Sequence, residues 1–297
     1  MTPLKQFSDA LVVQANAARS FVAEIRAQHC SHRSGTLWRP DIVVASEQSL
    51  PKAETFEVAV AGSEPARASL SGRDPGTNVA VLKLDRALAG VLPARADAQT
   101  GMVTLAFGAD GHGGVTVRFG TVCATAPEWR SRAGGKIDRR IVLDLALSPR
   151  EDGGPVLDVE GRLLGISTLG HADSVLAIPH ATVERSVEAL LTHGRVERGW
   201  LGVALHPVAI PDAWRETAEE KTGLMVMSAA SEGPAAGAGV LPGDILLGID
   251  GARTSHACRL AERLGAESVG REIELGVLRS GTRLSLRAVV ATRPDNA

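Results

Sequence analysis

Two histidines and one cysteine near the start of this chain are its most obvious candidates for metal chemistry. His29, Cys30 and His32 stand close together, and imidazole and thiolate are ligands that zinc prefers. A structural zinc site needs a fourth ligand, and none is spaced to complete this set. We therefore expect no metal site and no cofactor.

Two further patterns could hold a phosphate or move a proton. The glycine-rich segment 111–114 would cradle a phosphate if a helix followed it, but the chain continues in strand-like apolar runs. We expect this segment to be a turn. His171 and His180 flank a short apolar run, and the simplest interpretation of both is a surface or loop histidine.

The elements that position these groups are mostly strands. From about residue 21 to residue 178, short apolar runs rich in β-branched residues recur between Gly, Pro and Asp. No helical pattern interrupts them, which predicts an all-β barrel or double barrel. Apolar residues at helical spacing predict helices at 4–18 and 181–192. After residue 198 a second unit mixes strands with one predicted helix at 256–264.

Composition narrows the function. The formal net charge is −2 with no long basic run, so we expect no nucleic-acid partner. No stretch approaches the roughly 20 apolar residues of a membrane span. Three cysteines, far apart, do not make a disulfide framework. The N-terminus lacks the apolar core of a signal peptide, which predicts a cytoplasmic protein, or a periplasmic or exported one if the numbered chain lacks its leader.

Four segments carry a resemblance to a known family. They are GRDPGTNVAVLKLD at 72–85, EDGGPVLDVEGRLLGIST at 151–168, LAIPHATVERSVEALLTHGRVERGWLGV at 176–203 and SEGPAAGAGVLPGDILLGIDG at 231–251. In this order they resemble the HtrA/Deg-type trypsin-like serine proteases with a C-terminal PDZ domain. The resemblance covers about residues 20–293. It implies a mainly β fold, a chymotrypsin-like double β-barrel followed by an α+β PDZ domain.

The resemblance also suggests domain boundaries. We expect an N-terminal helical segment at 1–19, a trypsin-like domain at 20–180, a connector helix at 181–198 and a PDZ domain at 199–297.

The family's catalytic triad maps onto three residues of other types. Gln48 stands where the family has its histidine, Asn78 where it has its aspartate, and Asp152 where it has its serine. Serine protease chemistry needs a hydroxyl nucleophile and an imidazole base, and an amide side chain is not a base. The turn that shapes the oxyanion hole changes too, and the positions concerned are Arg150, Glu151 and Gly153. The sequence therefore predicts that the chain is not an enzyme, with Asp152 accepting hydrogen bonds from the Gln48 and Asn78 amides.

Two routes to catalysis are still open at this point. A carboxylate such as Asp152 can attack a carbonyl, but it would form a mixed anhydride without a base to activate water. The alternative is an active endopeptidase with an unconventional nucleophile, for which Ser148, four residues earlier, is the candidate.

The second unit resembles a peptide-binding module. Gly202 would let consecutive backbone N–H groups converge on a terminal carboxylate, and the strand that follows would offer an edge for an added peptide strand. The predicted peptide-binding residues are Trp200, Leu201, Gly202, Val203, Leu205, Leu260, Ala261 and Leu264. A purely structural role for Trp200, sealing the domain junction, is the alternative. The segment 206–222 is expected to hold a short helix around 212–220, and the sequence does not decide whether this segment caps or gates the groove.

These residues predict a protein-binding adaptor or scaffold. The expected partners are protein C-termini or extended peptides. Because HtrA relatives trimerise through their protease domains, the resemblance also implies a homo-oligomer, a trimer, or a mixed assembly with an active relative. A structural assembly subunit with a closed groove is a third possibility.

Overall fold

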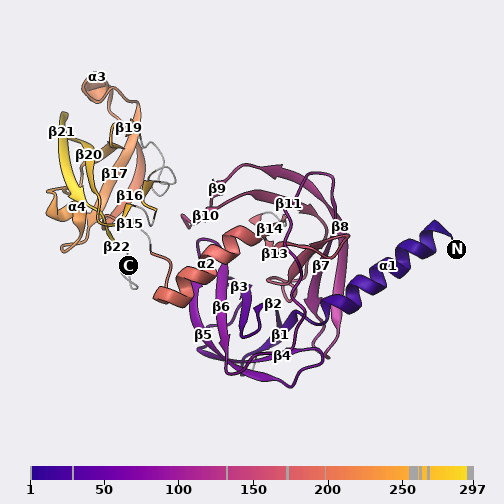
Figure 1. Cartoon of the computed structure of the whole chain (residues 1–297). Coiled ribbons are helices and arrows are strands. Elements are labelled where there is room, and N and C mark those ends of the chain that lie inside the picture. Colours follow the sequence, from indigo (N-terminus) through magenta and orange to yellow (C-terminus); the bar gives the residue numbers. More distant parts are fainter. Residues whose placement is uncertain are drawn as a thin grey trace. The chain divides into compact units, whose positions relative to one another are not determined.

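The computed structural model of the chain (Figure 1) describes residues 2–28, 30–131, 133–171, 174–197, 199–253, 260, 263–265 and 268–292. The chain divides into two compact units, Met1–Val196 and Glu197–Ala297.

The first unit contains two closed barrels of antiparallel strands. In the first barrel the spatial order is β1-β2-β3-β6-β5-β4. Its strands are β1 (Val22–Arg26), β2 (Arg33–Arg39), β3 (Ile42–Ser46), β4 (Thr55–Val60), β5 (Ala66–Asp74) and β6 (Val79–Leu84). The alternation in β4 shows why these segments are strands, since Phe56, Val58 and Val60 face the core while Thr55 and Glu57 face solvent.

The second barrel follows the order β11-β14-β13-β12-β7-β8. Its strands are β7 (Val103–Ala109), β8 (Val115–Ala126), β11 (Arg140–Asp144), β12 (Pro155–Asp158), β13 (Leu163–Leu169) and β14 (Val175–Pro179). A short ladder of β9 (Trp129–Arg130) with β10 (Lys136–Ile137) lies between β8 and β11 in the sequence. The predicted double barrel is confirmed.

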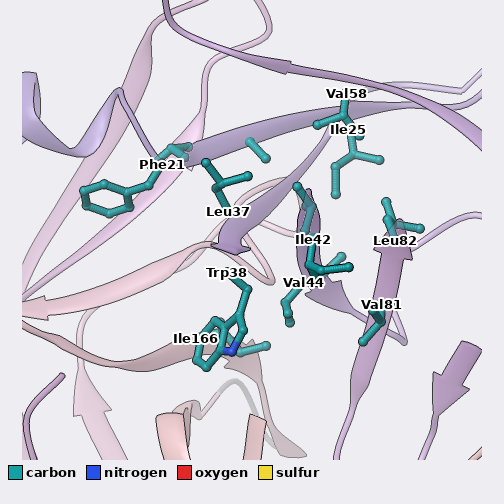
Figure 2. Packing of buried hydrophobic residues seen from close by; sticks show 14 of the residues in the cluster. Phe21, Ile25, Leu37, Trp38, Ile42, Val44, Val58, Val81, Leu82 and Ile166 are labelled. Carbon is teal, nitrogen blue, oxygen red and sulfur yellow. The ribbon is translucent and has the colours of Figure 1, made fainter. Parts of the chain in front are cut away.

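The core of the first barrel is built mainly from branched aliphatic side chains. Figure 2 shows Ile25, Leu37, Val44, Val58 and Leu82 converging, and all five are buried. The cluster extends to Ile166 of β13 and so reaches the second barrel. Burial of this apolar surface is the main force that holds the strands around the site.

Helix α2 (His180–His193) completes the same core. Val183, Val187 and Leu190 lie on its buried face, and the helix ends at Gly194, whose φ of 68° is the left-handed conformation that glycine adopts easily. Glu184 on this helix accepts hydrogen bonds from Trp38 Nε1 at 2.7 Å and from Arg39 Nη2 at 2.5 Å.

Helix α1 (Pro3–Ala18) confirms the predicted N-terminal helix and is mostly exposed. Thr2 caps it by accepting a hydrogen bond from Lys5 N, and Pro3 is suited to its first turn. Leu11 and Ala15 pack against the core, and Phe7 makes an edge-to-face contact with Phe119 of β8. Within the part of the chain that the structure describes, no helix is long and apolar enough to span a membrane.

The second unit is built on one antiparallel sheet with the order β16-β17-β18-β20-β21. The strands of this sheet are β16 (Val203–Ala209), β17 (Thr222–Ala229), β18 (Ile245–Ile249), β20 (Glu272–Arg279) and β21 (Thr282–Val289), with β19 (Ala252–Arg253) paired to β18. A separate two-stranded sheet pairs β15 (Gly199–Trp200) with β22 (Ala291–Thr292). Three short helical turns, η2 (Asp212–Trp214), α3 (Arg215–Ala218) and α4 (Pro234–Gly237), connect them. Most of the predicted helix 256–264 lies outside the described residues.

Candidate functional site

The polar site of the first unit lies where its two barrels meet. Gln48 follows the end of β3, Asn78 immediately precedes β6, and Asp152 stands in the turn before β12. The side-chain amide of Gln48 joins the two barrels, because Nε2 donates to Asp152 Oδ2 at 2.9 Å and to Leu169 O at 2.9 Å. The same amide nitrogen also lies 3.1 Å from Thr168 Oγ1.

Asn78 bonds to other residues than predicted. Its Nδ2 donates to Ser46 Oγ at 2.9 Å and to Thr168 Oγ1 at 2.6 Å, so it is not directed at Asp152. Its Oδ1 accepts from Gln48 N at 2.8 Å. The expectation that both amides donate to Asp152 is therefore correct for Gln48 and wrong for Asn78, whose two donor hydrogens are used by the hydroxyls. The φ of Asn78 is 57°, a left-handed conformation that asparagine adopts more readily than most residues.

Asp152 is a buried acid without a cationic partner among its described contacts. Its side chain is 2% exposed, and Oδ1 has no hydrogen-bond partner in the described part of the chain. Burial raises the pKa of Asp152 above its ordinary value, against the hydrogen bonds from Gln48 and from the Ser46 and Thr168 hydroxyls, which lower it. The carboxyl group is thus held in a neutral polar cluster.

The turn that carries Asp152 is fixed by its neighbour Glu151. Arg118 Nε donates to both Glu151 oxygens at 3.0 Å, and Ser148 N donates to Oε2 at 2.7 Å. Although burial opposes ionisation, these donors lower the pKa of Glu151. Glu151 is therefore a buried anion that anchors the turn to β8.

The rest of the turn is held by backbone contacts. Arg150 O accepts from Ser34 N at 2.9 Å and from Ser34 Oγ at 2.6 Å. Gly153 has a φ of 96°, and a Cβ atom there would lie 2.5 Å from Ser46 N, so only glycine fits. The three residues of the predicted oxyanion turn therefore lie together, next to Asp152.

The remaining candidate residues of the first unit either lie outside the Gln48–Asp152 cluster or form their described contacts with other groups. Ser148 Oγ accepts from Arg150 N at 3.4 Å, and His180 Nε2 lies 3.5 Å from Asp97 Oδ1. His171 is exposed in the loop before β14. His29 lies outside the described residues, and among those described no group of three or more His, Cys, Asp or Glu could hold a metal ion.

Several residues of the cluster could not be found from sequence spacing. Ser46, Thr168 and Leu169 lie at strand ends, and Arg118 lies within β8. They reach Gln48, Asn78 and Glu151 only through strand pairing, so their proximity depends on the register of the two barrels. The available signal was the position of Thr168 and Leu169 at the end of β13, since Gln48 and Asn78 also lie next to strand ends.

The predicted carboxylate loop of the second unit has a left-handed backbone at Gly202. Gly202 has a φ of 76°, and a Cβ atom there would lie 3.1 Å from both Gly233 Cα and the Trp200 ring. Gly202 O accepts from Ala230 N at 2.7 Å, and Leu201 O accepts from Ala235 N at 3.0 Å. These bonds direct the carbonyl groups of the loop into the unit.

The predicted walls of the groove lie beside this loop as far as the structure describes them. β16 is an edge strand of the sheet, and Val203 and Leu205 on it pack partly against the core. Leu260 is buried in the same core and Leu264 packs against it. Ala261 lies outside the described residues.

The segment 206–222 packs against the other face of the sheet. Ile210, Trp214 and Ala218 form a cluster with Ile245 and Leu247. Side chains alternate along β18, and its Leu246 belongs to the core that Leu205 and Leu260 join. The sequence leaves open whether this segment caps or gates the groove, and the structure uses its apolar residues on the opposite face of the sheet. The short helix expected there is present as η2 and α3.

Comparisons with known proteins identify both units. Residues 33–166 match the trypsin-like peptidase domain, and residues 199–290 match the PDZ domain. A probable periplasmic serine endoprotease DegP-like of Bartonella henselae is 28% identical over 86% of this chain and 52% of its own length. One of Brucella suis is 30% identical over 86% of this chain and 51% of its own length. The chain thus spans about half the length of these relatives.

Solved structures match a larger share of this chain and of their own length. The HtrA-type protease AlgW with decapeptide superposes with a TM-score of 0.73 at 26% identity, over 95% of this chain and 98% of that one. AlgW with tripeptide gives a TM-score of 0.70 at 29% identity, over 95% and 97%.

These likenesses correct one prediction and weaken another. The prediction that the chain is not an enzyme is overturned, because the relatives that match most of its length are named serine endoproteases. The predicted cytoplasmic location has no support, whereas its periplasmic alternative agrees with the names of those relatives. The prediction of a trypsin-like unit followed by a PDZ unit is confirmed. The chain is thus a homologue of the HtrA/DegP proteases, in which a trypsin-like peptidase domain precedes a PDZ domain.

Proposed function

We propose that the PDZ unit of this HtrA-type protein binds the C-termini or extended segments of other proteins. The observation that carries the proposal is the junction of the Gly202 loop with the edge strand β16. Backbone N–H groups of such a loop can hold a terminal carboxylate, while the edge strand pairs with the residues before it. Both AlgW structures contain a peptide, which is consistent with this use of the fold.

The groove would favour an apolar C-terminal residue. Val203 and Leu205 line it from β16, and Leu264 packs partly against the same core. Apolar walls around a few backbone donors are the usual composition of a specific binding site. We therefore expect selected peptides to end in an aliphatic or aromatic residue with a free carboxylate.

A C-terminal peptide library tests this proposal. The full chain should select peptides with a common apolar last residue, and Leu205→Asp should abolish selection because it places a charge in the apolar wall. Val289→Asp is the matched control, since Val289 is 56% exposed on β21 and should leave selection unchanged. Failure of the wild-type chain to select any C-terminal sequence would refute the proposal.

We also propose that the chain self-associates through helix α1 and strand β8. Leu4, Phe7 and Val13 on α1 are 77%, 43% and 65% exposed, and Phe119 on β8 is 49% exposed. Exposed apolar groups gain stability when a second copy covers them. Sedimentation should show an oligomer that Val13→Asp dissociates, whereas a monomeric wild-type chain would refute the proposal.

Endopeptidase activity is a second function, favoured by the names of the relatives. It requires a route without an imidazole at position 48, since the Gln48 amide cannot accept a proton. Ser148 is the candidate hydroxyl, and Asp152 is the group in the cluster that can accept a proton. Fluorophosphonate labelling, with cleavage of unfolded casein, tests it. Labelling that Ser148→Ala removes would support this route, and absence of both labelling and cleavage would refute the activity.

The periplasm is the proposed location, because the relatives are named periplasmic proteins. Fractionation of cells that express the gene under its own promoter tests this. Recovery of the chain with cytoplasmic markers would refute it.

A further inference from the structure

The outer strand β16 has a backbone orientation that is fixed at both of its ends. Gly202 O, just before the strand, accepts from Ala230 N at 2.7 Å. Ile210 N, just after it, donates to Lys221 O at 2.9 Å. Ala230 and Lys221 flank β17 (Thr222–Ala229), so both contacts point to the β17 side.

This fixes which residues of β16 face outward. Along a strand, successive residues turn their N–H and C=O groups to opposite sides. The residue numbers of Gly202 and Ile210 differ by an even number, so the even-numbered residues between them also face β17. Val203, Leu205 and Pro207 therefore face the open edge. The register shift between Ala204 and Leu205 does not alter this, because the extra residue, Met227, lies in β17.

The outward-facing residues differ in the backbone hydrogen-bonding groups that they present to an added strand. Val203 and Leu205 each present one N–H and one C=O group. Pro207 presents only a C=O group, and its ring occupies the place of the missing hydrogen. In an antiparallel pair, opposed residues exchange two hydrogen bonds, and a residue opposite Pro207 would leave its own carbonyl without a donor.

The register of a bound peptide follows from the loop. If the terminal carboxylate sits at the Gly202 loop, the last residue lies opposite Val203 and the third from the end lies opposite Leu205. The fifth from the end then lies opposite Pro207. We propose that Pro207 ends the hydrogen-bonded track, so that this PDZ unit reads only about the last four residues of its ligand. The inference rests on the proposed binding of C-termini.

A peptide length series tests the inference with the full chain. The probes are fluorescein-labelled peptides of three, four, six and eight residues that end in Ala-Val-Leu with a free carboxylate and are extended with alanine. For the wild type, affinity should rise from three to four residues and then stay constant. For Pro207→Ala, affinity should rise by a further 2- to 13-fold, roughly, between four and eight residues, which is the value of one net hydrogen bond.

His206→Ala is the matched control. His206 is the exposed neighbour of Pro207 and faces β17 through its backbone, so the variant should behave like the wild type. A wild-type affinity that keeps rising from four to eight residues would overturn the inference while the binding function stands. If no peptide binds, both the function and the inference fail. If Pro207→Ala does not fold by circular dichroism, the wild-type series decides alone.

Discussion

The side-chain amide of Gln48 donates to the carboxylate of Asp152 at 2.9 Å, and in this contact a neutral group faces a buried acid. Two other buried acids of the chain have a cation instead. Glu151 is bound by Arg118 and Asp244 by Arg279, and the pKa of each is lowered even though burial opposes ionisation. The pKa of Asp152 is raised by burial. At the position that the resemblance links to catalysis, burial therefore disfavours the negative charge.

Asp152→Asn should raise the free energy of unfolding at neutral pH. The variant removes a buried charge that lacks a cation but keeps an oxygen for the Gln48 amide, and the gain should be on the order of 1 kcal/mol. Because the folded-state pKa of Asp152 is raised, its stabilising contribution is present at low pH and lost as pH rises through that pKa. The difference between variant and wild type should thus vanish in acid. Urea unfolding at several pH values measures it.

Asp158→Asn is the control for that experiment. Asp158 is also buried, but Arg162 Nε donates to it at 2.7 Å. Removing this charge weakens the bonds from Arg162 Nε and from the backbone N–H groups of Glu160 and Arg162, so this variant should lose stability. Equal effects of the two substitutions would contradict the contrast drawn between the two acids.

Glu151→Gln should make the first unit less stable at neutral pH and less sensitive to acid. The lowered pKa of Glu151 means that its contribution is present above the unfolded-state pKa and is lost as pH falls through the folded-state pKa. The substitution weakens the contact with Arg118, at a cost of about 1–3 kcal/mol. Thermal unfolding between neutral and acidic pH checks this, and an unchanged pH slope would count against the role given to Glu151.

Glu184→Ala should destabilise the junction of α2 with the first barrel by about 1–3 kcal/mol, since it leaves the indole N–H of Trp38 without its acceptor. Glu184 also contacts Arg95 Nη2 at 2.6 Å. Glu188→Ala is the control. The Glu188 side chain is 59% exposed and contacts Arg39, but not Trp38 or Arg95. It should change the free energy of unfolding by less than about 0.5 kcal/mol. Urea titration of both variants measures the difference.

Gly202→Ala should weaken peptide binding about tenfold or more. The positive φ of Gly202 costs an alanine about 1–2 kcal/mol, and its Cβ would press on Gly233 and on the Trp200 ring. Gly243→Ala carries the same kind of strain at a φ of 93°, with open space around it. This control should lose stability but keep its affinity, as judged by anisotropy at a temperature where both variants are folded.

The sequence was sufficient to predict the architecture and part of each site. Periodic apolar runs predicted an all-β barrel or double barrel and helices α1 and α2, and the motifs grouped Gln48, Asn78 and Asp152 as one site. The direction of the Asn78 amide could not be predicted, because it depends on the left-handed backbone at that residue and on the Ser46 and Thr168 hydroxyls. Hydrogen-bond direction at short range depends on such details of geometry.

The contacts that anchor the Asp152 turn could not be predicted from the sequence either. Glu151 and Arg118 are 33 residues apart, and only the pairing of β8 with β7 and of β7 with β12 brings them together. Likewise, the apolar residues of 206–222 are compatible with either face of the sheet. The choice of the face with Ile245 and Leu247 is a result of three-dimensional packing.

One comparison tests the central claim, that the second unit recognises a C-terminal carboxylate through the Gly202 loop. The same eight-residue peptide ending in Ala-Val-Leu is measured against the full chain with a free carboxylate and as the C-terminal amide. The amide should bind about 10- to 100-fold more weakly, which corresponds to the loss of hydrogen bonds to a charged group. Equal affinity of the two peptides would contradict the claim.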